Sequence, residues 1–147
     1  MAAGWRKVSM GKASPRSNDV NSGRELAGKV AIITGAASGI GEAVARIYCE
    51  NRCSVLGVDI DTERLARIGR EIQEAGGDFV PVVADVTDEK TVQDFFKHAY
   101  DRWGSIDVLV NSAGRDSLAP PVTQVTLEEW NKTIGPNLTA VFLCCRD

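Results

Sequence analysis

From residue 29 onward the chain alternates between short apolar runs and longer segments whose apolar side chains recur every three or four positions. The runs, rich in Val, Ile and Leu, predict buried strands at residues 30–34, 54–59, 79–84 and 106–110. The segments with helical spacing predict helices around residues 40–48, 65–72, 92–103 and 127–134. Strands that alternate with helices of this length are typical of right-handed βαβ units, so the pattern predicts a parallel sheet.

One proline indicates how the strands are ordered. Pro81 lies within the third predicted strand, and proline is confined to edge strands, strand starts and bulges because it cannot donate to a ladder. In a doubly wound sheet of strand order 3-2-1-4 the third strand lies at an edge. We therefore expect an α/β fold of this order, with a crevice above the carboxyl ends of the first and fourth strands.

A glycine-rich turn joins the first predicted strand to the first predicted helix, in the run Thr34-Gly35-Ala36-Ala37-Ser38-Gly39-Ile40-Gly41. The first N–H groups of a helix lack helical partners and carry partial positive charge, so this arrangement suits a phosphate. Gly35 allows a sharp turn, Gly39 allows a pyrophosphate to approach the backbone, and Gly41 allows the helix to pack against the sheet. The motif predicts dinucleotide binding on a Rossmann-type fold.

Asp59 ends the second predicted strand, 18 residues beyond Gly41. A carboxylate there can accept both hydroxyls of an adenosine ribose and would repel a 2′-phosphate. Residues 36–38 contain no Arg or Lys that could compensate, so Asp59 favours NAD over NADP. The alternative is that Asp59 only caps the next helix. Asp61 could share the ribose contact or cap a helix that begins at Thr62.

Composition excludes several classes of function. The chain has 147 residues, 44% of them hydrophobic and 25% charged, which is ordinary for one soluble globular domain. A net charge of −3 gives no argument for nucleic acid or for an anionic membrane. No apolar run approaches the roughly 20 residues of a membrane span. The four cysteines lack C-x-x-C spacing and there is only one histidine, so we expect reduced thiols and no metal site.

The first 25 residues differ from the rest. Residues 1–24 hold five Arg and Lys against a single Asp and are rich in Ser, Gly and Asn. We expect residues 1–25 to be a disordered basic extension, and residues 26–147 to form the nucleotide-binding domain. Whether the extension is a targeting segment or reflects a start codon placed too far upstream stays open.

From residue 26 onward the chain resembles the short-chain dehydrogenase/reductase family of classical type. The resemblance rests on five motifs in the family's order, namely residues 34–41, Asp59, Asp85-Val86-Thr87, Asn111-Ser112-Ala113-Gly114 and Asn137-Leu138-Thr139. It implies an NAD(P)-dependent oxidoreductase that moves a hydride between the nicotinamide and a secondary alcohol or ketone. It also implies a homotetramer or homodimer.

The resemblance assigns roles position by position. Asp85 would bond the adenine amino group, with the Val86 backbone beside it. Asn111, at the start of the Asn111–Gly114 motif that includes Ala113, would border the ribose. Ser38 and Ile40 would lie along the pyrophosphate and the nicotinamide ribose. Asn137 resembles the asparagine that kinks its helix and holds a water of the proton relay, although Gly135-Pro136 precede it here, and a proline inside a helix removes a hydrogen bond.

In the family, the catalytic serine, tyrosine and lysine all lie at positions that would follow Asp147. We therefore expect this chain to be the cofactor-binding half of a longer cytoplasmic enzyme, inactive by itself, with further strands beyond Asp147. The first alternative is an enzyme similar to 3-oxoacyl-acyl-carrier-protein reductase that uses NADPH. The second is a dinucleotide-binding module without catalysis. The resemblance implies a small alcohol or ketone as substrate, and the sequence leaves its identity and the reaction direction open.

Overall fold

The computed structural model describes residues 25–115 and 120–147. Its strands are β1 (Val30–Thr34), β2 (Ser54–Asp59), β3 (Phe79–Val83) and β4 (Val108–Asn111). Its helices are α1 (Gly39–Glu50), α2 (Thr62–Glu74), α3 (Glu89–Trp103), α4 (Leu127–Ile134) and α5 (Ala140–Arg146), with a 3-10 turn η1 (Val122–Gln124) and a π-helical turn η2 (Gly135–Thr139). The extension predicted at residues 1–25 lies outside the described residues, except for Glu25.

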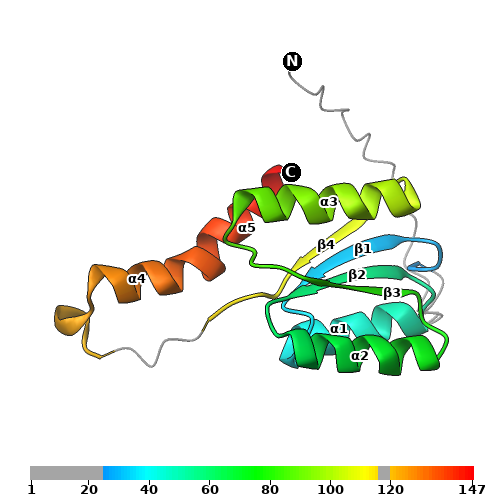
Figure 1. Ribbon diagram of the computed structural model, residues 1–147, viewed down its shortest axis with the longest axis horizontal. Helices are drawn as coiled ribbons and strands as arrows, with labels where there is room; N and C mark the ends of the chain where they lie inside the picture. The colour runs from blue at the N-terminus through cyan, green and yellow to red at the C-terminus, as the bar shows by residue number, and fades with distance from the viewer. Residues whose placement is uncertain (1–24, 116–119) are drawn as a thin grey trace, which may run out of the picture.

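The four strands form one parallel sheet of order β3-β2-β1-β4. Helices α1 and α2 cover one face, and α3 and α5 cover the other (Figure 1). The predicted α/β class and the strand order 3-2-1-4 are both confirmed. Pro81 lies opposite Gly57 on β3, which is an edge strand of the described sheet.

The first two strands have the predicted bounds, whereas β4 begins at Val108 rather than at residue 106. The reason is the side chain of Asp107, which replaces a backbone acceptor at the start of the ladder. The backbone N–H of Asp107 donates to the Val30 carbonyl at 2.8 Å, but the N–H of Val30 donates to the Asp107 carboxylate at 2.9 Å. The regular pairing of β4 with β1 therefore begins at Val108, one residue after Asp107.

Alternating residues of the central strands feed two cores, one on each face of the sheet. Ala31, Ile33 and Val55 face α1 and α2, while Ile32 and Leu56 face α3 and α5. All five are fully buried, and burial of each large side chain contributes about 1.5–3 kcal/mol.

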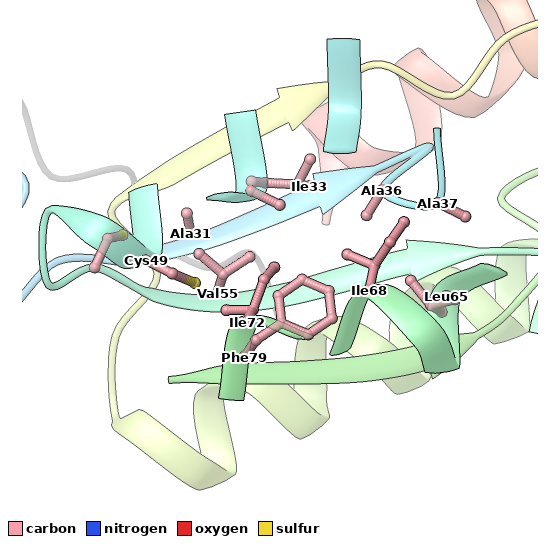
Figure 2. Packing of buried hydrophobic residues seen from close by; sticks show 12 residues of the cluster. Ala31, Ile33, Ala36, Ala37, Cys49, Val55, Leu65, Ile68, Ile72 and Phe79 are labelled. Atoms are coloured by element: carbon pink, nitrogen blue, oxygen red, sulfur yellow. The ribbon is translucent and has the colours of Figure 1, made fainter. Parts of the chain in front are cut away.

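The ring of Phe79 fills the first core beside Ile68 and Ile72 (Figure 2). It lies over Gly57, where a Cβ atom would stand 2.2 Å from the Phe79 Cζ atom. The glycine therefore makes room for the ring.

Helix termini follow the sequence closely. Asp61 caps α2 by accepting the N–H of Arg64 at 3.0 Å. Thr126 and Glu129 form a reciprocal capping box at the start of α4. The apolar stripe of α4 is exposed rather than buried, with Leu127 at 75% and Trp130 at 54% of full accessibility. Helix α4 extends away from the sheet in Figure 1, so no described segment covers this stripe.

Candidate functional site

The loops that follow β1 and β4 touch at the carboxyl edge of the sheet. The Thr34 hydroxyl oxygen accepts the N–H groups of Ser112 at 3.2 Å and Ala113 at 3.1 Å. Gly35 adopts φ +69°, and a Cβ atom there would stand 2.7 Å from both the Ala113 nitrogen and the Ser112 oxygen. Only glycine permits this approach, so the first and fourth strands meet where the sequence predicts.

The glycine-rich turn leaves the N-terminus of α1 open. Ser38 is the N-cap residue, and its side chain makes no capping hydrogen bond. Gly41 packs against the turn itself, because a Cβ atom would lie 2.1 Å from the Gly35 oxygen. A Cβ atom on Gly39 would meet no atom within 4 Å. The N–H groups at this terminus therefore face a space that an anion can enter.

Asp59 lies beside the same turn, and both of its carboxylate oxygens are engaged. One oxygen accepts the N–H of Ala37 at 2.9 Å, and the other accepts the N–H of Asp61 at 3.0 Å. Each oxygen of a carboxylate can accept a second hydrogen bond. The half-buried Asp59 thus holds the turn in place and still presents two acceptors to a ligand.

Asp85 occupies the loop after β3. One of its oxygens accepts both the N–H of Thr87 at 2.8 Å and its hydroxyl at 2.7 Å. No hydrogen bond to the other oxygen is present among the described residues. Val86, which lies between Asp85 and Thr87 in the chain, is buried in the core on the α3 and α5 face of the sheet. The arrangement orients one free carboxylate oxygen and an adjacent backbone segment at the sheet edge.

These loops enclose an open cleft of about 910 Å³, a size that suits a small-molecule ligand. Nine of the predicted binding residues line it, namely Gly35, Ser38, Gly39, Ile40, Asp59, Asp85, Val86, Ala113 and Gly114. Gly41, Asn111 and Asn137 do not line the cleft.

Asn111 pairs with Thr34 at the end of the ladder between β1 and β4. Its side chain, however, donates to the Cys145 sulfur on α5 at 3.6 Å. In this structure Asn111 therefore ties β4 to α5, and a contact with a ribose stays a prediction.

Asn137 joins the last helical segment to the β4 loop. Its side-chain oxygen accepts the N–H of Arg115 at 3.2 Å, and its amide nitrogen donates to the carbonyls of Arg115 at 2.8 Å and Thr133 at 2.9 Å. A Cβ atom on Gly114 would lie 2.6 Å from the Asn137 oxygen. Pro136 does not break the helix, because the π-helical turn η2 carries the chain from α4 into α5.

Several residues that line the cleft were not among the predicted binding residues, namely Ile60, Thr87, Arg115, Asn131, Lys132 and Pro136. Arg115 directly follows Gly114, so its place in the chain was a usable signal. The residues on α4 and η2 gave no such signal, because only the fold brings the last part of α4 and the start of η2 to the cleft.

The thiols take no part in this cleft. Burial raises the pKa of Cys49 to about 12 and the pKa of Cys53 to about 11, so both are inert at neutral pH. Within residues 25–115 and 120–147, no group of three His, Cys, Asp or Glu side chains could hold a metal ion. No helix in that same part of the chain is long and apolar enough to cross a bilayer.

A dinucleotide fits the residues present. The uncapped N-terminus of α1 and the bare backbone of Gly39 suit a diphosphate. The acidic side chains of Asp59 and Asp85, which lie at the end of β2 and after β3, suit an adenosine. The parallel sheet and this cleft define a Rossmann-type dinucleotide-binding domain.

The family follows from comparison with known proteins. Residues 29–147 match the family model described as short chain dehydrogenase, so the chain belongs to the short-chain dehydrogenase/reductase family. The resemblance seen in the sequence is thereby confirmed.

Curated relatives agree on this family. An uncharacterized oxidoreductase of Thermotoga maritima is 37% identical over 82% of this chain and 47% of its own length. A D-threitol dehydrogenase of Mycolicibacterium smegmatis is 37% identical over 82% of this chain and 46% of its own length. A 3-oxoacyl-acyl-carrier-protein reductase of Thermotoga maritima is 38% identical over 80% of this chain and 47% of its own length. The chain spans about half the length of the curated relatives it matches.

Solved structures share the fold. A metagenomic short-chain oxidoreductase in complex with NADP is 35% identical, with a TM-score of 0.79 over 82% of this chain and 55% of that protein. A short-chain dehydrogenase/reductase from Burkholderia phymatum in complex with NAD is 30% identical, with a TM-score of 0.80 over 83% of this chain and 43% of that protein. Both nicotinamide dinucleotides thus occur among its structural relatives.

Proposed function

We propose that this chain is the cofactor-binding half of an NAD-dependent oxidoreductase that interconverts a secondary alcohol and a ketone. The observation that carries the proposal is the position of Asp59, whose two engaged oxygens lie beside the glycine-rich turn at the cleft. Family membership supports the reaction type.

The preference for NAD rests on charge. A ribose with two free hydroxyls can donate to the two Asp59 oxygens, whereas a 2′-phosphate would place a second negative charge against them. Residues 36–38, which form the adjacent turn, carry no Lys or Arg. NAD therefore fits this chain better than NADP.

When bound, the nicotinamide supplies or accepts the hydride. The protein's share is to hold and orient it. The N-terminus of α1, with Ser38, Gly39 and Ile40, holds the pyrophosphate. Asp85 and Val86 hold the adenine, and Asn111, Ala113 and Gly114 border the ribose.

The proposed contribution of Asn137 to catalysis is to position the loop after β4. All the hydrogen-bonding groups of its side-chain amide serve the backbone of Arg115 and Thr133. Asn137 therefore holds the β4 loop against the helix, and in the complete enzyme this sets the place of any proton-relay water that its backbone binds.

A second candidate is reduction of 3-oxoacyl groups. The Thermotoga maritima 3-oxoacyl-acyl-carrier-protein reductase supports it at 38% identity. In the alternative predicted from the sequence, the enzyme with this activity uses NADPH. The two candidates thus differ in cofactor.

Titration of the complete polypeptide with NADH and with NADPH tests the proposal, with nicotinamide fluorescence as the readout. We expect NADH to bind at least about tenfold more tightly, which corresponds to roughly 1.4 kcal/mol. Tighter binding of NADPH would favour the second candidate. Absence of binding for either nucleotide would contradict both.

We also propose a cytoplasmic homodimer or homotetramer that acts on a small-molecule alcohol or ketone. All four cysteines are free thiols, as is usual in a reducing compartment. Association is supported by the exposed apolar side chains Leu127, Trp130, Leu138 and Phe142 on α4, η2 and α5. Sedimentation velocity of the complete polypeptide would show a monomer if the oligomer proposal is wrong.

A further inference from the structure

Charge changes sign along the carboxyl edge of the sheet. The strand order is β3-β2-β1-β4, and the residues at the cleft follow it: Asp85 after β3, Asp59 at the end of β2, Gly35 after β1 and Arg115 after β4. Two acidic residues therefore line the cleft at the end of β2 and after β3, and an arginine lines it after β4. Figure 1 shows β4 at the edge of the sheet opposite β3.

This order places Arg115 at the end of the cleft where a substrate must enter. The proposed function puts the adenosine over β2 and β3 and the pyrophosphate at the N-terminus of α1, beside β1. The other half of the dinucleotide then extends toward β4. Arg115 follows that strand in the chain and lines the same cleft. A molecule beside the nicotinamide therefore lies closer to Arg115 than the adenosine does.

The backbone of Arg115 is held on both sides. Its N–H donates to the Asn137 side-chain oxygen at 3.2 Å, and its carbonyl accepts from the Asn137 amide nitrogen at 2.8 Å. The backbone that carries the guanidinium is thus anchored before a ligand binds, so only the side chain has to be ordered on binding.

Among the residues that the structure describes, the positive charge of Arg115 is not neutralised by an ion pair. No carboxylate of residues 25–115 or 120–147 forms an ion pair with it. Among the described residues Lys132 is the second cation that lines the cleft, and it is paired with Glu128 at 2.5 Å. A guanidinium binds a carboxylate or phosphate through two parallel hydrogen bonds.

We propose that Arg115 is a specificity-determining residue that selects substrates bearing an oxyanion, either a carboxylate or a phosphate, close to the reacting alcohol or ketone. The inference rests on the proposed function, because it takes the direction of the cofactor from it. Neutral alcohols and ketones of the same size are then poor substrates.

The test compares charged and neutral probes on the complete polypeptide with NADH bound. The carboxylate probes are acetoacetate and 4-oxopentanoate, each against its methyl ester, and the phosphate probe is dihydroxyacetone phosphate against dihydroxyacetone. The quench of NADH fluorescence reports the Kd of each ternary complex, and turnover reports KM and kcat. The comparison of the two probe types shows which oxyanion the site prefers.

The variants are Arg115→Gln, Arg115→Lys and, as a matched control, Arg70→Gln on the exposed face of α2. We expect wild type to prefer at least one charged probe over its neutral partner. Arg115→Gln should lower that preference about tenfold to hundredfold, the usual worth of hydrogen bonds to a charged group. Its effect should fall on KM, while the Kd for NADH stays constant. Arg115→Lys should restore part of the preference, and Arg70→Gln should keep all of it.

Two results would overturn the inference: wild type that binds charged and neutral probes equally well, or an Arg115→Gln variant that weakens both equally. Failure of wild type to bind NADH would instead contradict the proposed function. The binding titration therefore separates the two failures.

Discussion

The Asp59 carboxylate and the Ala37 backbone N–H are joined by a hydrogen bond of 2.9 Å, although they lie 22 residues apart in the chain. The residue proposed to read the ribose is thus also a support of the phosphate-binding turn. This shared contact links the choice of cofactor to the shape of the turn.

Asp59→Asn and Asp59→Ala separate the two roles. The asparagine oxygen can still accept from Ala37, but its amide group cannot accept from a ribose hydroxyl. We expect Asp59→Asn to raise the Kd for NADH about tenfold and to lower the melting temperature slightly, because its amide nitrogen would face the N–H of Asp61, which loses its acceptor. Asp59→Ala should weaken NADH binding further and lower the melting temperature more, because the N–H of Ala37 also loses its acceptor. Equal NADH binding by all three proteins would contradict the ribose role of Asp59.

Two glycines of the turn should respond differently to alanine. In Gly41→Ala the new Cβ atom would lie 2.1 Å from the Gly35 oxygen, so we expect a loss of about 1–3 kcal/mol in the free energy of unfolding. In Gly39→Ala nothing lies within 4 Å, but φ is +53°, and the methyl group enters the space proposed for the pyrophosphate. This variant should cost about 1 kcal/mol of stability and mainly reduce NADH affinity.

Denaturant unfolding measures the stability of both glycine variants, and NADH titration measures their affinity for the cofactor. Gly28→Ala serves as a control for left-handed backbone, because Gly28 has φ +75° and open space around it, outside the cleft. If Gly39→Ala binds NADH as wild type does, the pyrophosphate does not lie against residue 39.

Gly114 and Asn137 should behave as a coupled pair. A methyl group at residue 114 would stand 2.6 Å from the Asn137 oxygen, so Gly114→Ala must displace that side chain and release Arg115. We expect Gly114→Ala and Asn137→Ala each to lower the free energy of unfolding by about 1–2 kcal/mol, the worth of the lost hydrogen bonds. The double variant should cost little more than either change alone. A double-mutant cycle that gives additive losses would exclude the coupling.

Asp107 should make stability depend on pH. Its carboxylate accepts the N–H of Val30 and faces the Lys29 ammonium at 3.0 Å, and these two contacts hold the pKa of Asp107 below its ordinary value of 3.8. A lowered pKa stabilises the fold above the unfolded value, and that contribution disappears as the pH falls through the still lower folded value. Asp107→Asn should therefore be less stable than wild type at pH 7, and the difference should shrink below about pH 4.

Thermal melts of wild type and Asp107→Asn at pH 7, 5, 4 and 3 measure this difference. Asp94→Asn is the control, because within the described part of the chain Asp94 pairs only with Lys90 on the exposed face of α3, and such pairs contribute little. A gap in melting temperature that stays constant from pH 7 to pH 3 would show that the Asp107 charge plays no part.

Local pattern was sufficient for the elements and for their order. Periodicity marks strands and helices because each element buries one face or one stripe, and Pro81 placed β3 at an edge because proline cannot donate to a ladder. The start of β4 was wrong by two residues, since no local pattern shows that the Asp107 side chain takes the place of a backbone acceptor.

The class of site was predictable from the residue pattern alone: glycines stand where the backbone must turn or be bare, and acids stand at the end of β2 and after β3. Three contacts depend instead on how the chain folds: Asp59 supports the turn through Ala37, Asn111 donates to Cys145, and Asn137 holds the Arg115 backbone. These are contacts between segments that lie far apart in sequence. Side-chain partners of that kind depend on how the layers pack, and the identity of each residue alone does not reveal them.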